Sequence, residues 1–197
     1  GIIIPDKNYL YNVKQLCIKY NILLICDEVQ TGLGRTGNML GSYGIKPDIV
    51  VLGKALSGGM LPISCVLANN EIMELLEPGS HGSTYGGNPL ATSIVPDAIN
   101  IIKDECLTKN AFTMGHLFRN ELQQYVNNGI LKDVRGKGLL NAIEFHSDDY
   151  AEKVVNKLRK NGLLTKTTKG STIRMCPPLI INKFQMNESL EIIHKYF

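Results

Sequence analysis

Two short apolar runs, each followed closely by a charged side chain, constrain the fold of this chain most. Residues 22–26 and 49–52 are rich in branched aliphatic residues and are bounded by polar or glycine positions. Such runs are typical of parallel strands that are covered on both faces. Asp27 follows the first run directly, and Lys54 comes two residues after the second. Because ligands bind outside the carboxyl ends of strands in open α/β sheets, this acid and this amine predict one shared cofactor site.

The composition of the 197 residues is that of a folded protein and argues against several functional classes. A hydrophobic fraction of 44% is ample for a packed core. The net charge of +3 comes from scattered Lys and Arg, so nucleic-acid binding is not expected. No apolar stretch is long enough for a membrane span, so no membrane association is expected. The four histidines lack metal-ligand spacing, and no metal site is expected.

The five cysteines are far apart in the sequence and form no paired motif. We interpret them as free thiols of a reducing compartment, with the cytoplasm as the expected location and the mitochondrial matrix as the alternative. The chain begins at Gly1 in the middle of a pattern and without a signal region, which predicts a fragment of a longer protein.

Periodicity predicts two domains that meet near residue 108, the first spanning residues 1–107 and the second residues 108–197. The second alternates strands and helices in the manner of a small α+β domain. Asn88 and Pro89 form a good helix start, and Pro96 should kink the helix that follows. Helices are expected at residues 7–20, 69–76, from 88 onward, 107–126, 148–161 and 187–197, and strands at 22–26, 48–52, 63–68, 131–135, 139–145, 163–166 and 172–176.

Lys54 is the sharpest candidate for a catalytic residue. Most lysines keep the amine in solvent and have no chemical role. A lysine that attacks an aldehyde needs a neutral amine, which partial burial and nearby positive charge favour. The small residues around Lys54, among them Gly53, Gly58 and Gly59, would let a flat ring approach the backbone.

Asp27 and Gln30 each have a structural and a functional interpretation. Asp27 could form a salt bridge or cap a loop, or it could pair with a protonated ring nitrogen, an interaction of about 1–4 kcal/mol in a partly screened site. Such a pair would keep the ring able to accept electrons. Gln30 could be a surface amide, or it could donate to a phenolic oxygen of the same ring.

Three further motifs carry weaker signals. Residues 32–37 match GxGxxG, but they neither follow a strand directly nor open a helix, so we interpret them as a mobile loop. Ser83 and Thr84, among glycines, are either ordinary turn hydroxyls or part of a phosphate loop. Arg174 lies in an apolar strand and is either a paired core charge or a bidentate clamp for a carboxylate.

Taken together, these segments resemble the class-III (ornithine-type) pyridoxal-phosphate aminotransferases. The resemblance rests on residues 24–37 (LICDEVQTGLGRTG), 47–59 (PDIVVLGKALSGG) and 81–90 (HGSTYGGNPL). Residues 134–143 (VRGKGLLNAI) and 173–179 (IRMCPPL) look most like the branch of the family that acts on ornithine. The similarity covers nearly the whole chain and corresponds to the carboxy-terminal half of the family.

The resemblance implies a pyridoxal-phosphate-dependent transferase of fold type I. Residues 1–107 would be part of the large, mixed or parallel-sheet cofactor domain, and residues 108–197 the small C-terminal α+β domain. The protein would be a homodimer with active sites at the subunit interface. It would transfer the δ-amino group of L-ornithine to 2-oxoglutarate, giving glutamate 5-semialdehyde and glutamate.

The resemblance also implies a role for each candidate residue. Lys54 would attach the pyridoxal 5'-phosphate and carry protons, while Asp27 would pair with the ring nitrogen. Gln30 and Val29 would also contact the cofactor. The remaining candidates are Ser83 and Thr84, for the phosphate of the neighbouring subunit's cofactor, and Arg174, for a carboxylate of the 2-oxo acid or glutamate.

Two alternatives remain open at this point. The substrate could be acetylornithine or another ω-amino compound, because the cofactor motifs are shared by these enzymes. The 197-residue chain could also be a non-catalytic fragment, because the first phosphate loop and the ring-stacking aromatic residue of the family lie in its other half.

Overall fold

A computed structural model describes residues 1–197, which divide into two compact units. The N-terminal unit comprises Pro5–Gly34 and Asn38–Cys106. The C-terminal unit comprises Gly1–Ile4, Arg35–Gly37 and Leu107–Phe197. The main change of unit therefore falls between Cys106 and Leu107. Two short segments from the first part of the chain join the C-terminal unit, which the sequence patterns did not predict.

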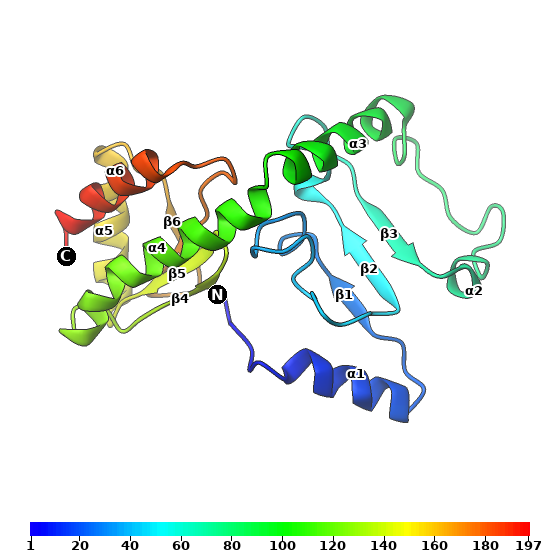
Figure 1. The fold of residues 1–197 in the computed structure, drawn as a ribbon, viewed down its shortest axis with the longest axis horizontal. Helices are drawn as coiled ribbons and strands as arrows, with labels where there is room; N and C mark the ends of the chain where they lie inside the picture. The colour runs from blue at the N-terminus through cyan, green and yellow to red at the C-terminus, as the bar shows by residue number, and fades with distance from the viewer. The chain divides into compact units, whose positions relative to one another are not determined.

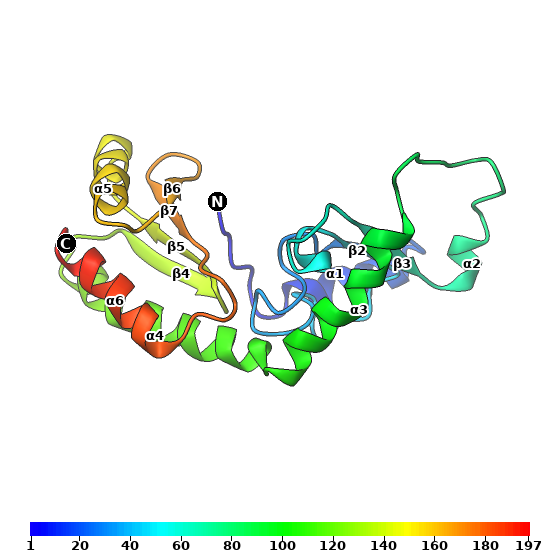
Figure 2. The same ribbon diagram turned by 90° about the horizontal axis from the view of Figure 1, so that it is seen from above.

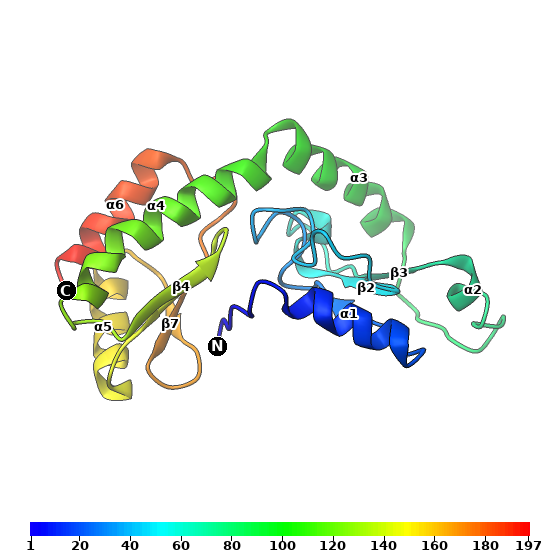
Figure 3. The ribbon, with the colours of Figure 1, turned by 60° about the horizontal axis from the view of Figure 1, so that its bottom comes forward.

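The N-terminal unit is built on a three-stranded sheet with the order β1-β2-β3. The strand β1 pairs in parallel with β2, and β2 pairs antiparallel with β3. The helices α1 and α3 lie on opposite sides of this sheet (Figures 1 and 3). In chain order, the elements are α1 (Tyr9–Lys19), β1 (Ile25–Asp27), β2 (Ile49–Leu52), the 3-10 turn η1 (Lys54–Ser57), β3 (Cys65–Ala68), α2 (Asn70–Met73) and α3 (Pro89–Asp104).

Local capping determines where α2 and α3 begin. The Asn69 side chain accepts a hydrogen bond from the Ile72 amide, and the Asn88 side chain accepts one from the Ala91 amide. These bonds satisfy amides that have no partner inside the helix. The predicted start of α3 is therefore confirmed. Pro96 lies inside α3, and the helix continues on both sides of it.

The first strand is shorter and more exposed than its apolar sequence predicts. Only Ile25–Asp27 pair in the sheet, and the Ile25 residue is 57% exposed. The prediction that both faces of this strand are covered is wrong for the described chain. The physical reason is that β2 is the only element in extensive contact with β1, so no helix covers the faces of this strand.

One ion pair ties α1 to the strands. The Lys14 amine donates to both carboxylate oxygens of Asp48, at 2.9 and 2.8 Å. The Leu24 amide donates to the same carboxylate at 2.8 Å. The hydrogen bonds from Lys14 and Leu24 hold the pKa of Asp48 below its usual range. This carboxylate therefore links the helix, the start of β1 and the start of β2.

The C-terminal unit contains a four-stranded antiparallel sheet with the order β4-β5-β7-β6. The helices α4 and α6 pack against each other beside this sheet, and α5 contacts β6 and β7 (Figure 2). In chain order, the elements are α4 (Leu107–Asn127), β4 (Asp133–Lys137), β5 (Leu140–Glu144), α5 (Asp148–Lys160), β6 (Lys166–Thr167), β7 (Thr172–Met175) and α6 (Lys183–His194).

The core of the chain is concentrated in this second unit. One apolar cluster joins all three helices to the sheet, and several of its members are fully buried, including Leu122, Ile143, Leu158 and Ile173. The amphipathic spacing of α4 and α5 places their apolar residues on the face that meets the sheet. The cluster therefore fixes the strand β7, which carries Arg174.

Several element boundaries in this unit differ from those predicted, for example that of β4, which spans Asp133–Lys137 rather than residues 131–135. The helix α6 begins at Lys183 rather than at residue 187, because Asn182 and Gln185 form a reciprocal capping box. The strand β6 comprises only Lys166–Thr167, since pairing with β7 is limited to two residue pairs.

Candidate functional site

Asp27 and Lys54 lie at the same edge of the N-terminal sheet. Asp27 is the last residue of β1 and is paired in register with Val51 of β2. Lys54 comes two residues after β2 ends at Leu52. Because β1 and β2 are parallel, their carboxyl ends share one edge. The predicted juxtaposition of strand ends is therefore present.

Lys54 has an unusual backbone conformation. Its φ is 45°, in the left-handed region that non-glycine residues seldom adopt. Such a conformation persists only where the surroundings enforce it. Here Leu56 and Ser57 are buried within η1, and the Ser57 hydroxyl accepts a hydrogen bond from the Leu61 amide at 3.1 Å. The turn thus holds Lys54 exposed, and its amine makes no hydrogen bond or ion pair.

The loops after β1 and β2 lie against each other. A Cβ on Gly53 would lie 3.5 Å from a methyl carbon of Val29, an ordinary van der Waals distance. The Val29 amide donates to Oδ1 of Asp27 at 3.0 Å, which leaves the second carboxylate oxygen without a partner. Gln30 is exposed next to them. The residues Asp27, Val29 and Gln30 therefore form one short loop beside the turn that carries Lys54.

Glu28 organises this loop, a role that sequence reasoning missed. Glu28 is only 3% exposed. Its carboxylate accepts hydrogen bonds from the Gly41 amide at 2.8 Å, from the Ser42 amide at 2.7 Å and from the Thr31 hydroxyl. Burial acts to raise the pKa of Glu28, but these hydrogen bonds outweigh it and hold the pKa below the usual range. The signal in the sequence was an acid directly after Asp27 in an apolar setting.

Ser83 and Thr84 lie in the exposed loop between α2 and α3, which stands away from the sheet (Figure 2). The Ser83 hydroxyl accepts a hydrogen bond from the Gly86 amide at 2.9 Å, while the Thr84 hydroxyl has no partner. Neither side chain makes a hydrogen bond with the residues around Lys54. Their hydroxyl groups remain accessible to a ligand.

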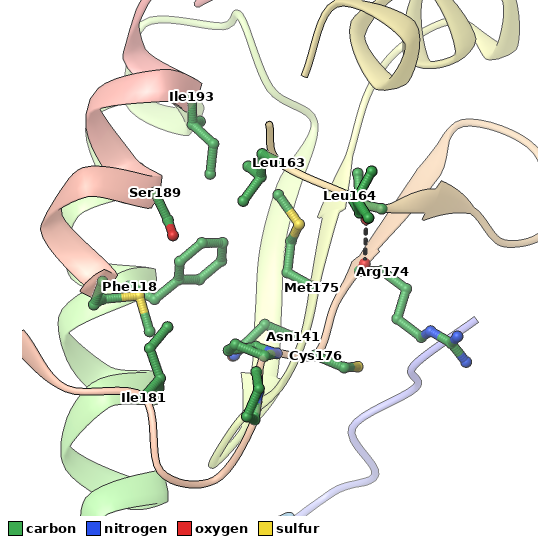
Figure 4. A pocket seen from close by; sticks show the side chains of 14 residues that line it. Phe118, Asn141, Leu163, Leu164, Arg174, Met175, Cys176, Ile181, Ser189 and Ile193 are labelled. Carbon is green, nitrogen blue, oxygen red and sulfur yellow. Dashed lines mark hydrogen bonds between the residues drawn. The ribbon is translucent and has the colours of Figure 1, made fainter. Parts of the chain in front are cut away.

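Arg174 lies on β7, in the C-terminal unit. Its main-chain carbonyl accepts a hydrogen bond from the Thr165 hydroxyl at 2.6 Å, but its guanidinium has no hydrogen-bond or ion-pair partner. The residue borders a largely apolar cavity of about 290 Å³, and its side chain points away from that cavity (Figure 4). Arg174 is therefore not the paired core charge that one sequence interpretation allowed.

The glycine-rich segment 32–37 is not the mobile loop that we predicted. Leu33 is buried, and its amide donates to the Met39 carbonyl at 2.6 Å. Arg35 donates to the carbonyls of Leu139 and Pro177. Contacts with residues more than a hundred positions away thus fix this segment, and periodicity alone could not show them.

Two broader properties bear on function. No helix has both the length and the apolar character needed to cross a membrane. No group of three or more His, Cys, Asp and Glu side chains is arranged to hold a metal ion.

Comparisons with known proteins identify the family of the chain. A family model described as aminotransferase class-III matches residues 1–197. The mitochondrial ornithine aminotransferase of Drosophila melanogaster is 51% identical over 197 residues, covering 99% of this chain and 46% of that protein. This chain therefore spans about half the length of the curated relatives it matches.

Solved structures also match the fold closely. An ornithine aminotransferase from Plasmodium yoelii superposes with a TM-score of 0.94 at 51% identity, covering 100% of this chain and 53% of that one. An acetylornithine aminotransferase from Elizabethkingia anophelis gives a TM-score of 0.95 at 44% identity, covering 100% and 50%. The mixed α/β architecture is therefore that of these aminotransferases.

Proposed function

Because the chain belongs to the aminotransferase class-III family, we propose that it forms part of a pyridoxal-phosphate-dependent ornithine aminotransferase. The reaction would move the δ-amino group of L-ornithine to 2-oxoglutarate, giving glutamate 5-semialdehyde and glutamate. The single observation that carries this proposal is the pair of unengaged groups at one sheet edge, the Lys54 amine and the second oxygen of Asp27. The ornithine aminotransferases of Drosophila and Plasmodium, at 51% identity, favour ornithine as the substrate.

The donor set fits pyridoxal phosphate. The cofactor supplies an aldehyde carbon and a ring that accepts electrons while its nitrogen is protonated. The exposed Lys54 amine would bond to that carbon and later hold the transferred proton on Nζ. The free oxygen of Asp27 would keep the ring nitrogen protonated, through an attraction of about 1–4 kcal/mol. Gln30 and Val29 would orient the ring from the same loop.

The remaining candidates would bind anionic groups. Thr84, with Ser83 beside it, would donate to a phosphate of the neighbouring subunit's cofactor in a homodimer with active sites at the subunit interface. Arg174 would bind a carboxylate of the 2-oxo acid or glutamate, since its unpaired guanidinium offers a planar pair of donors.

The test is the visible absorbance of the cofactor bound to the full-length protein. Wild-type protein should show a band of enzyme-attached cofactor that is lost in Lys54→Ala. Lys46→Ala is a matched control, because Lys46 is also exposed and lies in the same unit. An unchanged band in Lys54→Ala would contradict the assignment of Lys54.

Acetylornithine is the second candidate substrate, because the Elizabethkingia acetylornithine aminotransferase superposes as closely as the ornithine enzymes. Rates on ornithine and on acetylornithine, measured with the same full-length protein, decide between them. We expect the higher kcat/KM for ornithine, and a higher value for acetylornithine would replace this substrate assignment.

A non-catalytic role for the isolated 197 residues is favoured by one observation. The helix α1 buries none of its residues, so the N-terminal unit leaves much apolar surface uncovered. We therefore expect poor activity from these residues alone. Binding of pyridoxal phosphate and ornithine turnover by the isolated chain at the full-length rate would reject this alternative.

The sequence favours the cytoplasm as the location of the protein. The Drosophila relative is named as a mitochondrial enzyme, which favours the mitochondrial matrix instead. Fractionation of cells that express the full-length protein would distinguish the two compartments.

A further inference from the structure

Two guanidinium groups without carboxylate partners act on one thiol in the C-terminal unit. Arg174 has no side-chain partner, and Arg35 donates only to main-chain carbonyls. Burial raises the pKa of the Cys176 thiol, and the positive charges of Arg174 and Arg35 oppose this rise. Both positive charges therefore act on the Cys176 thiol, directly after the end of β7.

The main chain of Arg35 is held rigidly. The Leu139 amide donates to the Arg35 carbonyl at 2.9 Å, and the Arg35 guanidinium donates back to the Leu139 carbonyl at 3.3 Å. A Cβ on Gly138 would lie 2.4 Å from the carbonyl carbon of Thr36. The loop that carries Arg35 thus packs backbone to backbone against the turn between β4 and β5, so the direction of the arginine is fixed.

The third contact of Arg35 lies just beyond Arg174. After β7 ends at Met175, the chain continues through Pro177 and Pro178, which have no amide hydrogen to donate. The strand therefore cannot continue its ladder there. The Arg35 guanidinium supplies a charge-assisted hydrogen bond to the Pro177 carbonyl instead.

We propose that Arg35 is a positioning residue for the carboxylate site of Arg174. It fixes the main chain that follows Arg174 through its hydrogen bond to the Pro177 carbonyl. Because main-chain carbonyls satisfy Arg35 while the Arg174 guanidinium has no partner, the carboxylate of an incoming 2-oxo acid would pair with Arg174. This inference rests on the proposed function and extends it to one half of the reaction.

The experiment measures the two half-reactions of the full-length enzyme separately. Replacing Arg35→Met removes the charge and the bond to Pro177, and should raise the KM for 2-oxoglutarate about tenfold, the scale of a lost charged hydrogen bond. The KM for ornithine should change less than about twofold, because Arg174 serves the 2-oxo acid. Arg35→Lys keeps the charge and one donor, so its KM for 2-oxoglutarate should rise by only about threefold.

Arg119→Met is the matched control. Arg119, like Arg35, is a half-buried guanidinium that donates to neutral oxygens, at 3.1 Å to the Gly138 carbonyl and 2.6 Å to Oδ1 of Asn141, but it has no bond to Pro177. Arg119→Met should lower thermal stability as Arg35→Met does. The ratio of its KM for 2-oxoglutarate to its KM for ornithine should nevertheless stay that of wild type.

Three results would overturn the inference. One is an equal change of both KM values in Arg35→Met, and another is the same KM ratio in Arg119→Met as in Arg35→Met. The third applies if Arg35→Met does not fold. An unchanged KM for 2-oxoglutarate in Arg35→Lys then overturns the inference. A wild-type enzyme without transaminase activity would instead reject the proposed function, and this inference with it.

Discussion

The two units differ in how much of their apolar surface they bury. In the C-terminal unit, three helices and the sheet share one continuous core, with Leu122 and Ile173 fully buried. In the N-terminal unit, α1 buries no residue and Ile18 is 62% exposed. Since burial of apolar surface is the main stabilising contribution to folding, the two units should differ in stability when the 197 residues stand alone.

The difference also separates two groups of candidate site residues. The six candidates that would contact the cofactor lie in the less buried unit, whereas Arg174 lies on a strand fixed by the larger core. The six are Asp27, Val29, Gln30, Lys54, Ser83 and Thr84. Local hydrogen bonds of Glu28 and Ser57 hold the loop that carries Asp27 and the turn that carries Lys54 in place. We infer that the sheet-edge residues depend on loop contacts, whereas Arg174 depends on the core.

The largest expected effect is a core truncation in the C-terminal unit. Leu122→Ala should destabilise that unit by about 2–5 kcal/mol, because it removes a fully buried side chain and leaves a cavity. Ile18→Ala on α1 should change stability by less than about 0.5 kcal/mol, because that side chain is exposed. Amide hydrogen exchange measures each unit separately. Equal effects of the two substitutions would break the comparison.

A smaller contrast is expected at two glycines with positive φ. Gly138→Ala should cost about 2–4 kcal/mol, because its φ of 56° disfavours a side chain and the new Cβ would meet the Thr36 backbone. Gly79 has a φ of 84° but no atom within 4 Å of a Cβ. Gly79→Ala should therefore cost only about 1–2 kcal/mol. Urea unfolding monitored by hydrogen exchange checks both values. A larger loss of stability in Gly79→Ala than in Gly138→Ala would contradict the packing argument.

The smallest effect concerns pH in the N-terminal unit. Because the folded pKa of Glu28 is below its ordinary value, its stabilising contribution is present above the ordinary glutamate range and is lost as the pH falls through the lowered folded pKa. Glu28→Gln should cost about 1–3 kcal/mol at pH 7, with the difference from wild type shrinking in acid. Hydrogen exchange of Gly41 and Ser42 at several pH values is the measurement. The exposed Glu152→Gln is the control, and a constant difference across pH would reject this account of Glu28.

Local sequence signals predicted much of the fold. The helix starts at Asn69 and Asn88 depend on neighbours three residues away, so the sequence alone revealed them. The same signal is present at Asn182 and Gln185, and it places the start of α6 at Lys183 rather than at the predicted residue 187. The strand ends with Asp27 and Lys54 were predicted because branched apolar runs stop there.

Contacts between distant residues could not be predicted in this way. The contacts of Arg35 with Leu139 and Pro177 join residues more than a hundred positions apart, so no local pattern in residues 32–37 indicates them. The exposure of β1 was also missed, because an apolar run shows that a strand prefers burial but not what covers it. The roles of the site residues depend on a cofactor and stay predictions.

The central claim is that the Lys54 amine bonds to the cofactor aldehyde at the sheet edge shared with Asp27. The most direct measurement is borohydride reduction of the full-length protein with pyridoxal phosphate, followed by peptide mapping. The account predicts that the reduced cofactor is found on Lys54, and that Asp27→Ala lowers turnover while the label stays on that lysine. Label on another lysine with Lys54 unmodified would contradict it.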